Sequence, residues 1–523
     1  MSNVVRTTIR KWVPLLVSVI ALMAASVACS GDGDATSSAT SADGQPKYGG
    51  TLTVTMYTGG STSFDPPMLL GDITLAATRQ FYNTLVSVGH DLSVKPELAT
   101  SWEPNADLTS YTFNLRQDVT FRNGKEMKAE DVLFSVNRLL DEEIDSPARS
   151  TFTVIKNMVA LNDYTVRFDL NKANALFPEI FSMYQAKIYP SNIDVARLEL
   201  EEFGSGPFML EEYLPNERIV LTRNPDYWDE GKPYLDKIVM LVIQEPATRA
   251  EALKNGDVDM IWMLQHQSAA SLEAHSDTSV QEIPSASYLN LAMDVRTEPF
   301  DNVLVRRAFQ AATDRQAILQ AALAGKGGIA SDHPIPSSDP NFNSECAPPA
   351  YDPELAKSLL AEAGYPDGID QILYTSTAGP GMVEMAVAYK ERAAAAGIRI
   401  DVQQMPEDAY WAKIWMVEPF VTVYWFGRNP DQALSIVYLS DGSWNESYYN
   451  NPTVDELILK ARGQADDLGR AKTYGEVQCL LIDEVPRIIP VFQPMLNGVR
   501  NDVKGVQVHP RGYLVLVDAW LDR

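Results

Sequence analysis

The residues best suited to recognise a charged ligand lie together at positions 425–431, whose sequence is WFGRNPD. The stretch follows a buried strand that is predicted to end at Trp425, so it is expected at the edge of a sheet. The guanidinium of Arg428 can hold a carboxylate through two hydrogen bonds and would repel an ammonium group. Alternatively, Arg428 pairs with an acid of the chain itself, such as Asp431 or Asp408, and only shapes the loop.

Aromatic side chains could form the walls of such a site, because aromatic faces stack on peptide bonds, sugars and heteroaromatic rings. Any one of them could equally belong to a hydrophobic core. A loop with the sequence YTGGS follows a predicted strand over residues 51–56 and adds further candidates. The candidate ligand-binding residues are Arg428, Trp425, Phe426, Tyr57, Thr58, Gly59, Trp262, Tyr288 and Trp411, with Trp415 as a further aromatic candidate.

The common catalytic motifs are missing from the sequence, which has no G-x-S-x-G, S-x-x-K, H-E-x-x-H, C-x-x-C or Walker loop. The five histidines show no metal-ligand spacing, and the polar stretch around His266 and His275 predicts surface positions. Adjacent acids such as Glu201 and Glu202 are predicted to be solvated helix faces instead of an acid–base pair. The sequence therefore predicts binding without catalysis, and neither a metal nor a cofactor is expected.

Length and charge limit the class of protein. A chain of 523 residues is too long for one small core, which predicts two or three domains or lobes. The apolar fraction of 45% is ordinary for a globular protein. Lys and Arg total 43 against 69 Asp and Glu, a formal charge of −26. Because such a surface repels phosphate backbones, nucleic acid is not expected as a partner.

The N-terminus has the features of a targeting segment. A positively charged end precedes an apolar run that stops at Ala25, and the sequence SVAC follows at residues 26–29. This resembles a lipobox, in which Cys29 becomes the lipidated first residue, although Ser26 stands where Leu is usual. Residues 1–29 are therefore expected to be a lipoprotein signal peptide. The alternative is an uncleaved anchor, for which the run is short, since a span needs about 20 residues.

Residues 30–46 are rich in Gly, Ser, Thr, Ala and Asp, a composition that cannot form a core and predicts a flexible tether. The globular body is expected to begin near Lys47. Apart from Cys29, the chain has only Cys346 and Cys479, which can pair in only one way. A disulfide and two buried free thiols both remain open.

Several motifs occur in a fixed order along the chain. Residues 98–138 contain LATSWE, YTFNLR, VTFRNG and AEDVLFSVNR, which predict two short strands, a turn and an amphipathic helix. GSGPF at residues 204–208 and RNPDYW at 223–228 follow, and then a helix that is predicted to be capped by Asp352 and to end at Gly364. The series resembles the extracellular solute-binding proteins of peptide-type ABC importers, which bind dipeptides, oligopeptides, glutathione or nickel. The resemblance extends over nearly the whole mature chain.

The alternation of strands and helices predicts an α/β protein. The resemblance implies more: a two-lobed fold of the periplasmic-binding-protein type, class II, with an inserted domain and a hinged cleft that closes on the ligand. Trp102 and Trp228 lie in family motifs away from the expected cleft and are assigned to packing. The implied segments are residues 47–88, 204–290 and 490–523 for lobe I, 89–203 for the inserted domain, and 291–489 for lobe II.

The resemblance also bears on the ligand. Peptide binders of this family commonly carry an Asp about three residues after the Trp, where it pairs with the peptide α-ammonium; here Arg428 takes that place after Trp425. The W-x-G-R form resembles the glutathione-type subgroup and implies a carboxylate partner. The implied protein is a receptor anchored outside the cell membrane through Cys29, a monomer that delivers a peptide-like solute to ABC permease and ATPase subunits. Alternatives are an oligosaccharide or other non-peptide ligand, a ligand-sensing surface lipoprotein, and a hydrolase.

Overall fold

The computed structural model describes residues 44–56, 63–69, 72–90 and 92–523. The chain divides into two units, Met1–Gln45 and Pro46–Arg523, and the second contains every element described below. The predicted lipidation site Cys29 and the predicted ligand residues Tyr57, Thr58 and Gly59 lie outside the described residues. Within the described residues, no helix combines the length and the apolar composition needed to cross a membrane.

One mixed sheet of eleven strands is the main framework. Its order is β15-β14-β16-β12-β17-β11-β1-β10-β9-β8, and β13 pairs with β17 beside this path. The pairings of β1 with β10 and β11, and of β14 with β15 and β16, are parallel. The strands are β1 (Thr51–Met56), β8 (Phe208–Leu214), β9 (Arg218–Arg223), β10 (Lys237–Val242), β11 (Met260–Ile261), β12 (Thr278–Met293), β13 (Gly328–Ile329), β14 (Ile369–Ser376), β15 (Ile398–Met405), β16 (Phe420–Trp425) and β17 (Arg487–Arg500).

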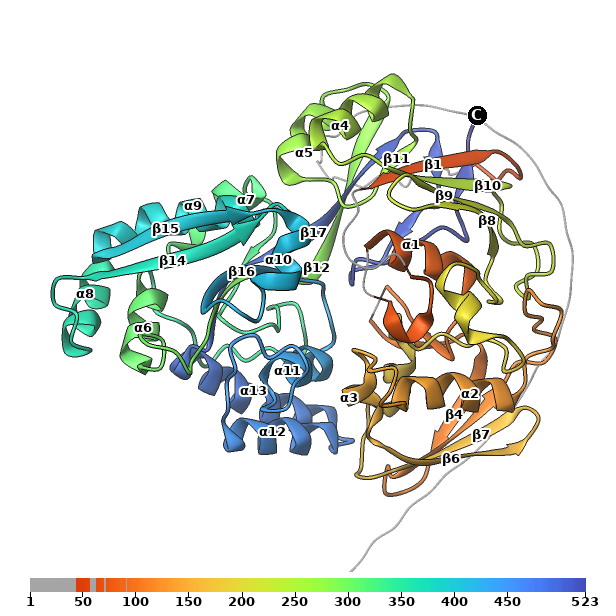
Figure 1. The fold of residues 1–523 in the computed structure, drawn as a ribbon, viewed down its shortest axis with the longest axis horizontal. Coiled ribbons are helices and arrows are strands. Elements are labelled where there is room, and N and C mark those ends of the chain that lie inside the picture. Colours follow the sequence, from red (N-terminus) through yellow and green to blue (C-terminus); the bar gives the residue numbers. More distant parts are fainter. Residues whose placement is uncertain (1–43, 57–62, 70–71, 91) are drawn as a thin grey trace, which may run out of the picture. The chain divides into compact units, whose positions relative to one another are not determined.

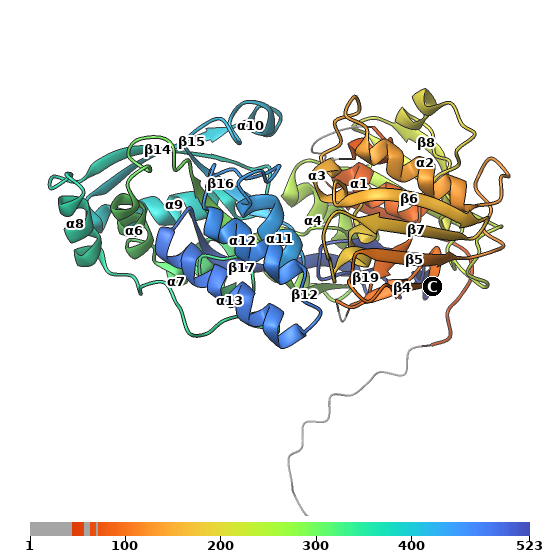
Figure 2. The ribbon, with the colours of Figure 1, turned by 90° about the horizontal axis from the view of Figure 1, so that it is seen from below.

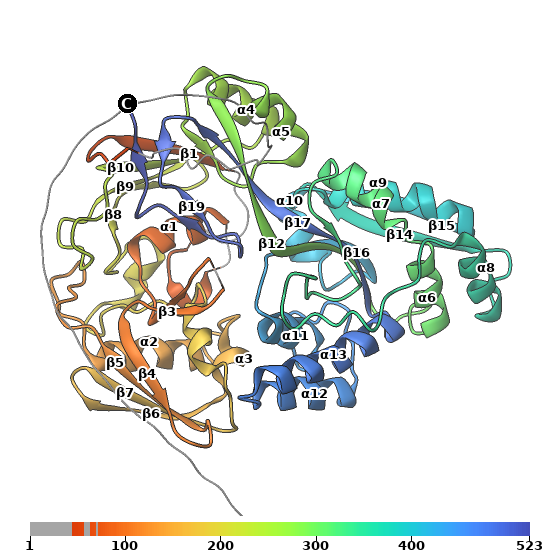
Figure 3. The ribbon, with the colours of Figure 1, turned by 180° about the vertical axis from the view of Figure 1, so that it is seen from behind.

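Two long antiparallel strands, β12 with 16 residues and β17 with 14, join the halves of this sheet (Figures 1 and 3). We call the half with β1 and β8–β11 the first lobe and the half with β14–β16 the second lobe. Each lobe has its own buried core. The pairing of β12 with β17 is irregular between Ile283 and Ser287, where the chain passes from one lobe to the other. The lobe boundaries expected at residues 290 and 490 fall within these two strands.

The inserted region contains a four-stranded antiparallel sheet of order β4-β5-β7-β6, whose strands lie side by side in Figure 2. Alternate residues of β5 (Ser110–Leu115) are buried, as the sequence predicts, and α2 (Ala129–Leu140) buries the apolar stripe predicted for it. The second predicted strand, around residues 119–121, is wrong: only an isolated bridge between Thr120 and Glu126 forms, because the turn that follows leaves no length for a ladder. The other strands are β4 (Ala99–Pro104), β6 (Ile155–Asn162) and β7 (Thr165–Leu170).

Helices cover the sheets, and several begin at a residue whose side chain caps the first turn. Asp352 accepts hydrogen bonds from the amides of Glu354 and Leu355 at the start of α8, as the Asp-Pro pair predicts. The helices are α1 (Asp72–Phe81), α3 (Arg149–Phe152), α4 (Pro246–Asn255), α5 (His266–Glu273), α6 (Val303–Ala311), α7 (Arg315–Leu323), α8 (Pro353–Glu362), α9 (Met382–Ala393), α10 (Glu407–Lys413), α11 (Pro430–Tyr438), α12 (Pro452–Arg462) and α13 (Asp467–Glu484).

Three pairs of short strands complete the fold: β2 (Val86–Val88) with β3 (Val94–Pro96), β18 (Val503–Lys504) with β21 (Trp520–Leu521), and β19 (Gln507–Val508) with β20 (Leu514–Val515). In the second lobe, a disulfide joins Cys346 to Cys479, with 5.5 Å between their Cα atoms. It ties the long segment that precedes α8 to helix α13.

Candidate functional site

The segment after β16 is held in place by close backbone packing. A Cβ atom on Gly427 would lie 3.1 Å from the amide nitrogen of Ala286 and 3.2 Å from the carbonyl oxygen of Pro510, so a side chain here would force the neighbouring backbone to shift by a few tenths of an ångström. The Gly427 amide donates to the Ser287 hydroxyl at 3.0 Å. Asn429 then caps α11 by accepting from the Gln432 amide at 2.7 Å. These contacts fix the backbone on both sides of Arg428.

The Arg428 guanidinium is held by aromatic faces and one carbonyl. Its Nη1 donates to the Phe426 carbonyl at 3.1 Å, and its Cζ lies 5.0 Å from the Trp425 ring centroid and 5.6 Å from that of Trp444. Among the residues that the structure describes, no carboxylate forms an ion pair with it. Asp431, the first alternative partner, pairs instead with Arg462, and the Asp408 side chain lies outside the described part.

A cavity of about 50 Å³ lies between the lobes, with Arg428 in its wall. The first lobe contributes residues of α1, of the end of β11 and of the turn before β20, and the second lobe contributes the segment after β16. The predicted residues Trp262 and Phe426 line this cavity, so the structure brings these two together with Arg428. The lining residues are Leu75, Ala76, Arg79, Met183, Tyr184, Trp262, Phe426, Gly427, Arg428, Gln432, Arg511, Gly512, Tyr513 and Leu514.

Two further arginines of the cavity, Arg79 and Arg511, were not anticipated from the sequence. Arg511 is 3% exposed, and one of its terminal nitrogens pairs with Glu179. Its Nε and Nη1 find no hydrogen-bond acceptor among the described residues, nor does Nη2 of Arg79. The Arg79 guanidinium lies 3.8 Å from the ring centroid of Tyr513. A cation on the apolar side of α1, next to Leu75 and the buried Ala76, was the signal that could have revealed Arg79.

Behind Arg428, a buried carboxylate organises the aromatic residues of the second lobe. Glu446 accepts from the indole nitrogens of Trp415 at 2.7 Å and Trp425 at 3.2 Å, and from the Asn290 amide at 2.8 Å. It also pairs at 2.8 Å with Arg487, and both side chains of this pair are 0% exposed. The network fixes the orientation of Trp425, the ring on which Arg428 lies.

The remaining predicted aromatics among the described residues do not line the cavity. Tyr288 is 3% exposed in the core of the second lobe, where burial raises the pKa of its hydroxyl above the ordinary value. Trp411 is half-buried and packs edge-on against Trp415 and Tyr424. Trp425 supports Arg428 from behind and does not line the cavity.

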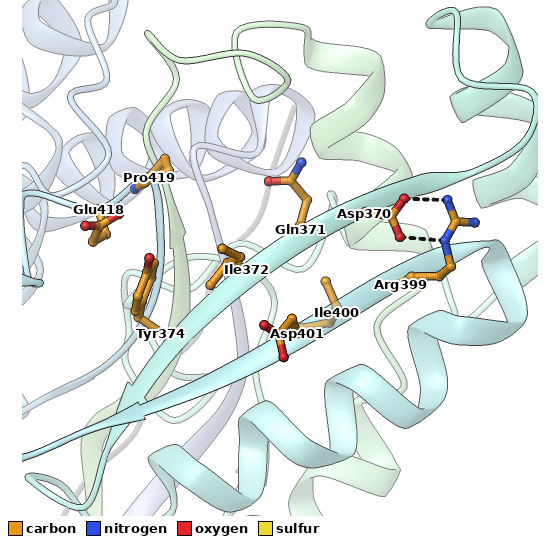
Figure 4. Close-up of a pocket in the computed structure, with 9 residues that line it drawn as sticks. All are labelled: Asp370, Gln371, Ile372, Tyr374, Arg399, Ile400, Asp401, Glu418 and Pro419. Atoms are coloured by element: carbon orange, nitrogen blue, oxygen red, sulfur yellow. Dashed lines mark hydrogen bonds and ion pairs between the residues drawn. The ribbon is translucent and has the colours of Figure 1, made fainter.

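A second hollow, of about 530 Å³, lies on β14 and the edge strand β15 of the second lobe (Figure 4). Its charged groups already have partners: Asp370 and Arg399 join through two hydrogen bonds of 2.7 and 2.9 Å. Ile372 in the same wall is 45% exposed. Although larger, this hollow is a groove on one sheet edge, whereas the smaller cavity combines both lobes and unpartnered donors. We therefore place the candidate site in the cavity.

Two predictions about polar residues are wrong. His266, predicted at the surface, is 4% exposed, because the first turn of α5 packs into a small apolar core of the first lobe; burial lowers its pKa to about 4. Glu202, predicted on a solvated helix face, is 5% exposed and pairs with Nε of Arg122 at 2.9 Å. Its carboxylate also accepts from the Gly204 amide, and burial raises its pKa to about 7. No group of three His, Cys, Asp or Glu side chains in the described residues is placed to hold a metal ion.

Two α/β lobes joined by paired hinge strands, with a polar cavity between them, define a solute-binding protein of the periplasmic type. The chain belongs to the bacterial extracellular solute-binding proteins of family 5, because the model described as "Bacterial extracellular solute-binding proteins, family 5 Middle" matches residues 93–447. This confirms the resemblance found in the sequence motifs and the two-lobed α/β fold inferred from it.

Characterised relatives bind several kinds of solute. The chain is 29% identical over 490 residues to heme-binding protein A of Haemophilus influenzae, with 86% of this chain and 88% of the relative covered. It is 28% identical over 485 residues to di/tripeptide-binding protein 2 of Pseudomonas aeruginosa, covering 86% and 90%. It is 25% identical over 470 residues to a glutathione-binding protein of Salmonella typhi, with the same coverage.

Two solved structures of binding proteins share the fold of this chain. The periplasmic binding protein DppA of Helicobacter pylori, in complex with the peptide STSA, superposes with a TM-score of 0.83 at 26% identity and covers 91% of this chain and 99% of its own. The oligopeptide-binding protein AppA of Bacillus subtilis, in complex with a nonapeptide, gives a TM-score of 0.81 at 24% identity, with coverages of 92% and 100%.

Proposed function

We propose that this protein is the extracytoplasmic receptor of an ABC importer and captures a small peptide-like solute that carries a carboxylate. The observation that supports this most directly is Arg428, a guanidinium in the wall of the cavity with no carboxylate partner among the described residues. A guanidinium held by two aromatic rings keeps the orientation needed for paired hydrogen bonds to a carboxylate. Di- and tripeptides and glutathione, named for two relatives, all carry that group.

The proposed mechanism is capture by lobe movement, without covalent chemistry. A cavity of about 50 Å³ is far below the roughly 300–1,000 Å³ of sites that enclose small molecules. A peptide can therefore enter only when the two lobes move apart. The natural hinge is the pair β12 and β17, where the pairing is irregular between Ile283 and Ser287. In this proposal lobe I comprises residues 47–88, 204–290 and 490–523, lobe II comprises 291–489, and residues 89–203 form the inserted domain.

The proposal extends to the setting of the protein. Lipidation of Cys29 would hold a monomer at the outer face of the cell membrane, with residues 30–46 as the tether. The loaded receptor would then deliver its solute to the permease and ATPase subunits of the importer. A receptor of this kind does not transform its ligand. Mass spectrometry after incubation with a bound peptide should therefore recover that peptide intact, and turnover would contradict the proposal.

A thermal-shift screen of the full chain in mild detergent tests the proposed ligand class. The panel holds free di- and tripeptides, their amino-blocked and carboxy-blocked forms, glutathione and short oligosaccharides. A ligand present at one hundred times its Kd stabilises the folded state by about 2.7 kcal/mol, which is readily detected. We expect amino-blocked peptides to raise the Tm and carboxy-blocked peptides to have no effect. A shift with oligosaccharides alone would overturn the peptide assignment.

A further inference from the structure

The charged side chains among the described residues that line the cavity between the lobes are all cations. Three arginines, Arg79, Arg428 and Arg511, contribute to its wall, and none of the aspartates or glutamates whose side chains the structure describes does. The protein as a whole carries a formal charge of −26, so this concentration of cations runs against the composition of the chain. A solute that fits such a wall must supply acceptors and negative charge.

Arg511 is the best defined of these donors. Its amide donates to Nδ1 of His509 at 3.1 Å, which fixes the backbone, and Glu179 of the 3₁₀ helix Phe177–Ser182 holds one end of the guanidinium. The side chain is 3% exposed, yet its Nε and Nη1 meet no acceptor among the described residues. Glu179 and the nearby Tyr513 therefore neutralise the charge only in part, and two buried N–H groups of a fixed fork, on a residue that lines the cavity, have no acceptor among the described residues.

Two neighbours on the same lobe have the same property. Nη2 of Arg79 and Nε1 of Trp262 are buried and have no acceptor among the described residues, and both residues line the cavity. Burial lowers the pKa of the Arg79 guanidinium, although the nearby Glu97 and the Tyr513 ring oppose this. A bound anion would offset the cost of burying this cation. All three residues belong to the first lobe, whereas Arg428 belongs to the second.

We propose that Arg79, Trp262 and Arg511 form an oxyanion-binding site on the first lobe, which acts with Arg428 on the second lobe to select solutes that carry two anionic groups. The solute class is thereby an acidic peptide or a similar dianion, with a carboxylate or a phosphate as the second group. This inference rests on the proposed function, because it assigns the ligand class of the same cavity. It also gives each lobe its own anchor, so that only a dianion is held from both sides.

Matched peptides test the inference on the full chain in detergent by isothermal titration calorimetry. Ala-Glu and Ala-Gln differ only in the second carboxylate, and Ala-phosphoserine and Ala-Ser differ only in the phosphate; each is used free and N-acetylated. We expect the dianion of at least one pair to bind about tenfold more tightly than its neutral partner, the effect of one hydrogen bond to a charged group. The pair that discriminates identifies carboxylate or phosphate as the second group.

Variants then assign the effect to residues. Arg79→Met removes a guanidinium that has no ion pair with a described residue, so it should fold at least as stably as the wild type while the preference for the dianion falls below about threefold. Trp262→Phe removes a single N–H and keeps every charge, and it should also reduce the preference. Arg399→Gln removes an exposed arginine outside the cavity and should leave the preference unchanged.

The outcomes separate the inference from the function on which it rests. Equal affinity for both members of each pair in the wild type would overturn the inference and leave the receptor proposal standing. A dianion preference that survives in Arg79→Met and in Trp262→Phe would remove these residues from the site and overturn the assignment. Failure of every carboxylate-bearing peptide to bind would instead contradict the proposed function itself. If Arg79→Met does not fold, Trp262→Phe and the wild-type pairs decide.

Discussion

Asp431 is bonded to Arg462, whose Nε lies 3.1 Å from its Oδ1, and not to Arg428 three residues earlier in the chain. The Tyr474 hydroxyl donates to the same carboxylate oxygen at 3.1 Å, so the acid is satisfied from within the second lobe. The acid that the sequence offered as an internal partner for Arg428 is therefore engaged elsewhere. This arrangement leaves the Arg428 guanidinium to the cavity.

Replacement of Arg428 by Ala should weaken a carboxylate-bearing ligand by about 1.5–3 kcal/mol, the value of a hydrogen bond to a charged group. The free energy of unfolding should change little, since no described carboxylate loses its partner. Arg462→Met is the matched control: it removes the same charge but strips Asp431 of its ion pair, and should cost about 1–3 kcal/mol of stability with little effect on affinity. Titration calorimetry measures the ligand affinity of each variant, and urea unfolding measures its free energy of unfolding. Unchanged affinity in Arg428→Ala would leave Arg428 a structural role only.

The sequence predicts local elements well where one period persists over the whole element. Strand β5 and helix α2 form where alternation and helical spacing indicated them, and β16 forms where a buried strand was predicted. Strand β12 was missed, because its first half is mostly half-buried without alternation and includes Pro284, and its second half is continuously buried. No single period describes such a strand; its pairing with β17 along most of its length makes it regular.

The candidate site is predictable only in part, for a related reason. Arg428 was found because it stands within a motif, beside the strand that positions it. Arg79 and Arg511 stand in the first and last parts of the body, in a helix and a turn with no shared motif, and only tertiary structure brings them to one cavity. Burial is likewise a property of packing, which is why His266 and Glu202 were misplaced at the surface.

The ion pair between Arg487 and Glu446 should dominate the stability of the second lobe. Both side chains are 0% exposed, so removal of one partner leaves the other as an unpaired buried charge. Arg487→Met should therefore lower the free energy of unfolding by about 3–5 kcal/mol. The double variant Arg487→Met with Glu446→Gln keeps an acceptor for one of the two tryptophans and leaves no unpaired charge. It should therefore be more stable than the single variant. Urea unfolding of the wild type, the single variant and the double variant measures these differences. If the single and the double variant lose the same free energy of unfolding, an uncompensated charge is not the cause.

The disulfide should contribute strongly to the free energy of unfolding, because Cys346 and Cys479 are 133 residues apart in sequence. The chain-entropy model gives an upper value of about 5 kcal/mol for a loop of this length, and measured values are commonly about 2–4 kcal/mol. The double variant Cys346→Ser with Cys479→Ser should lower the free energy of unfolding by about 2–4 kcal/mol. Iodoacetamide should label neither cysteine in the unreduced, unfolded wild type. Full labelling of both would show that the bond does not form.

Lys187 should make stability depend on pH above neutrality. It is 2% exposed, and burial, followed by the nearby Arg79, lowers its pKa from 10.5 to about 7, while Glu97 opposes the shift. Between pH 7 and pH 10.5 the unfolded chain therefore binds more protons at this residue than the folded protein does, so the free energy of unfolding rises with pH, by about 2 kcal/mol between pH 7 and pH 9. Lys187→Met should be more stable at pH 7 and should lack this rise. Urea unfolding at both pH values decides, and parallel pH dependence in the two proteins would mean that Lys187 keeps its ordinary pKa.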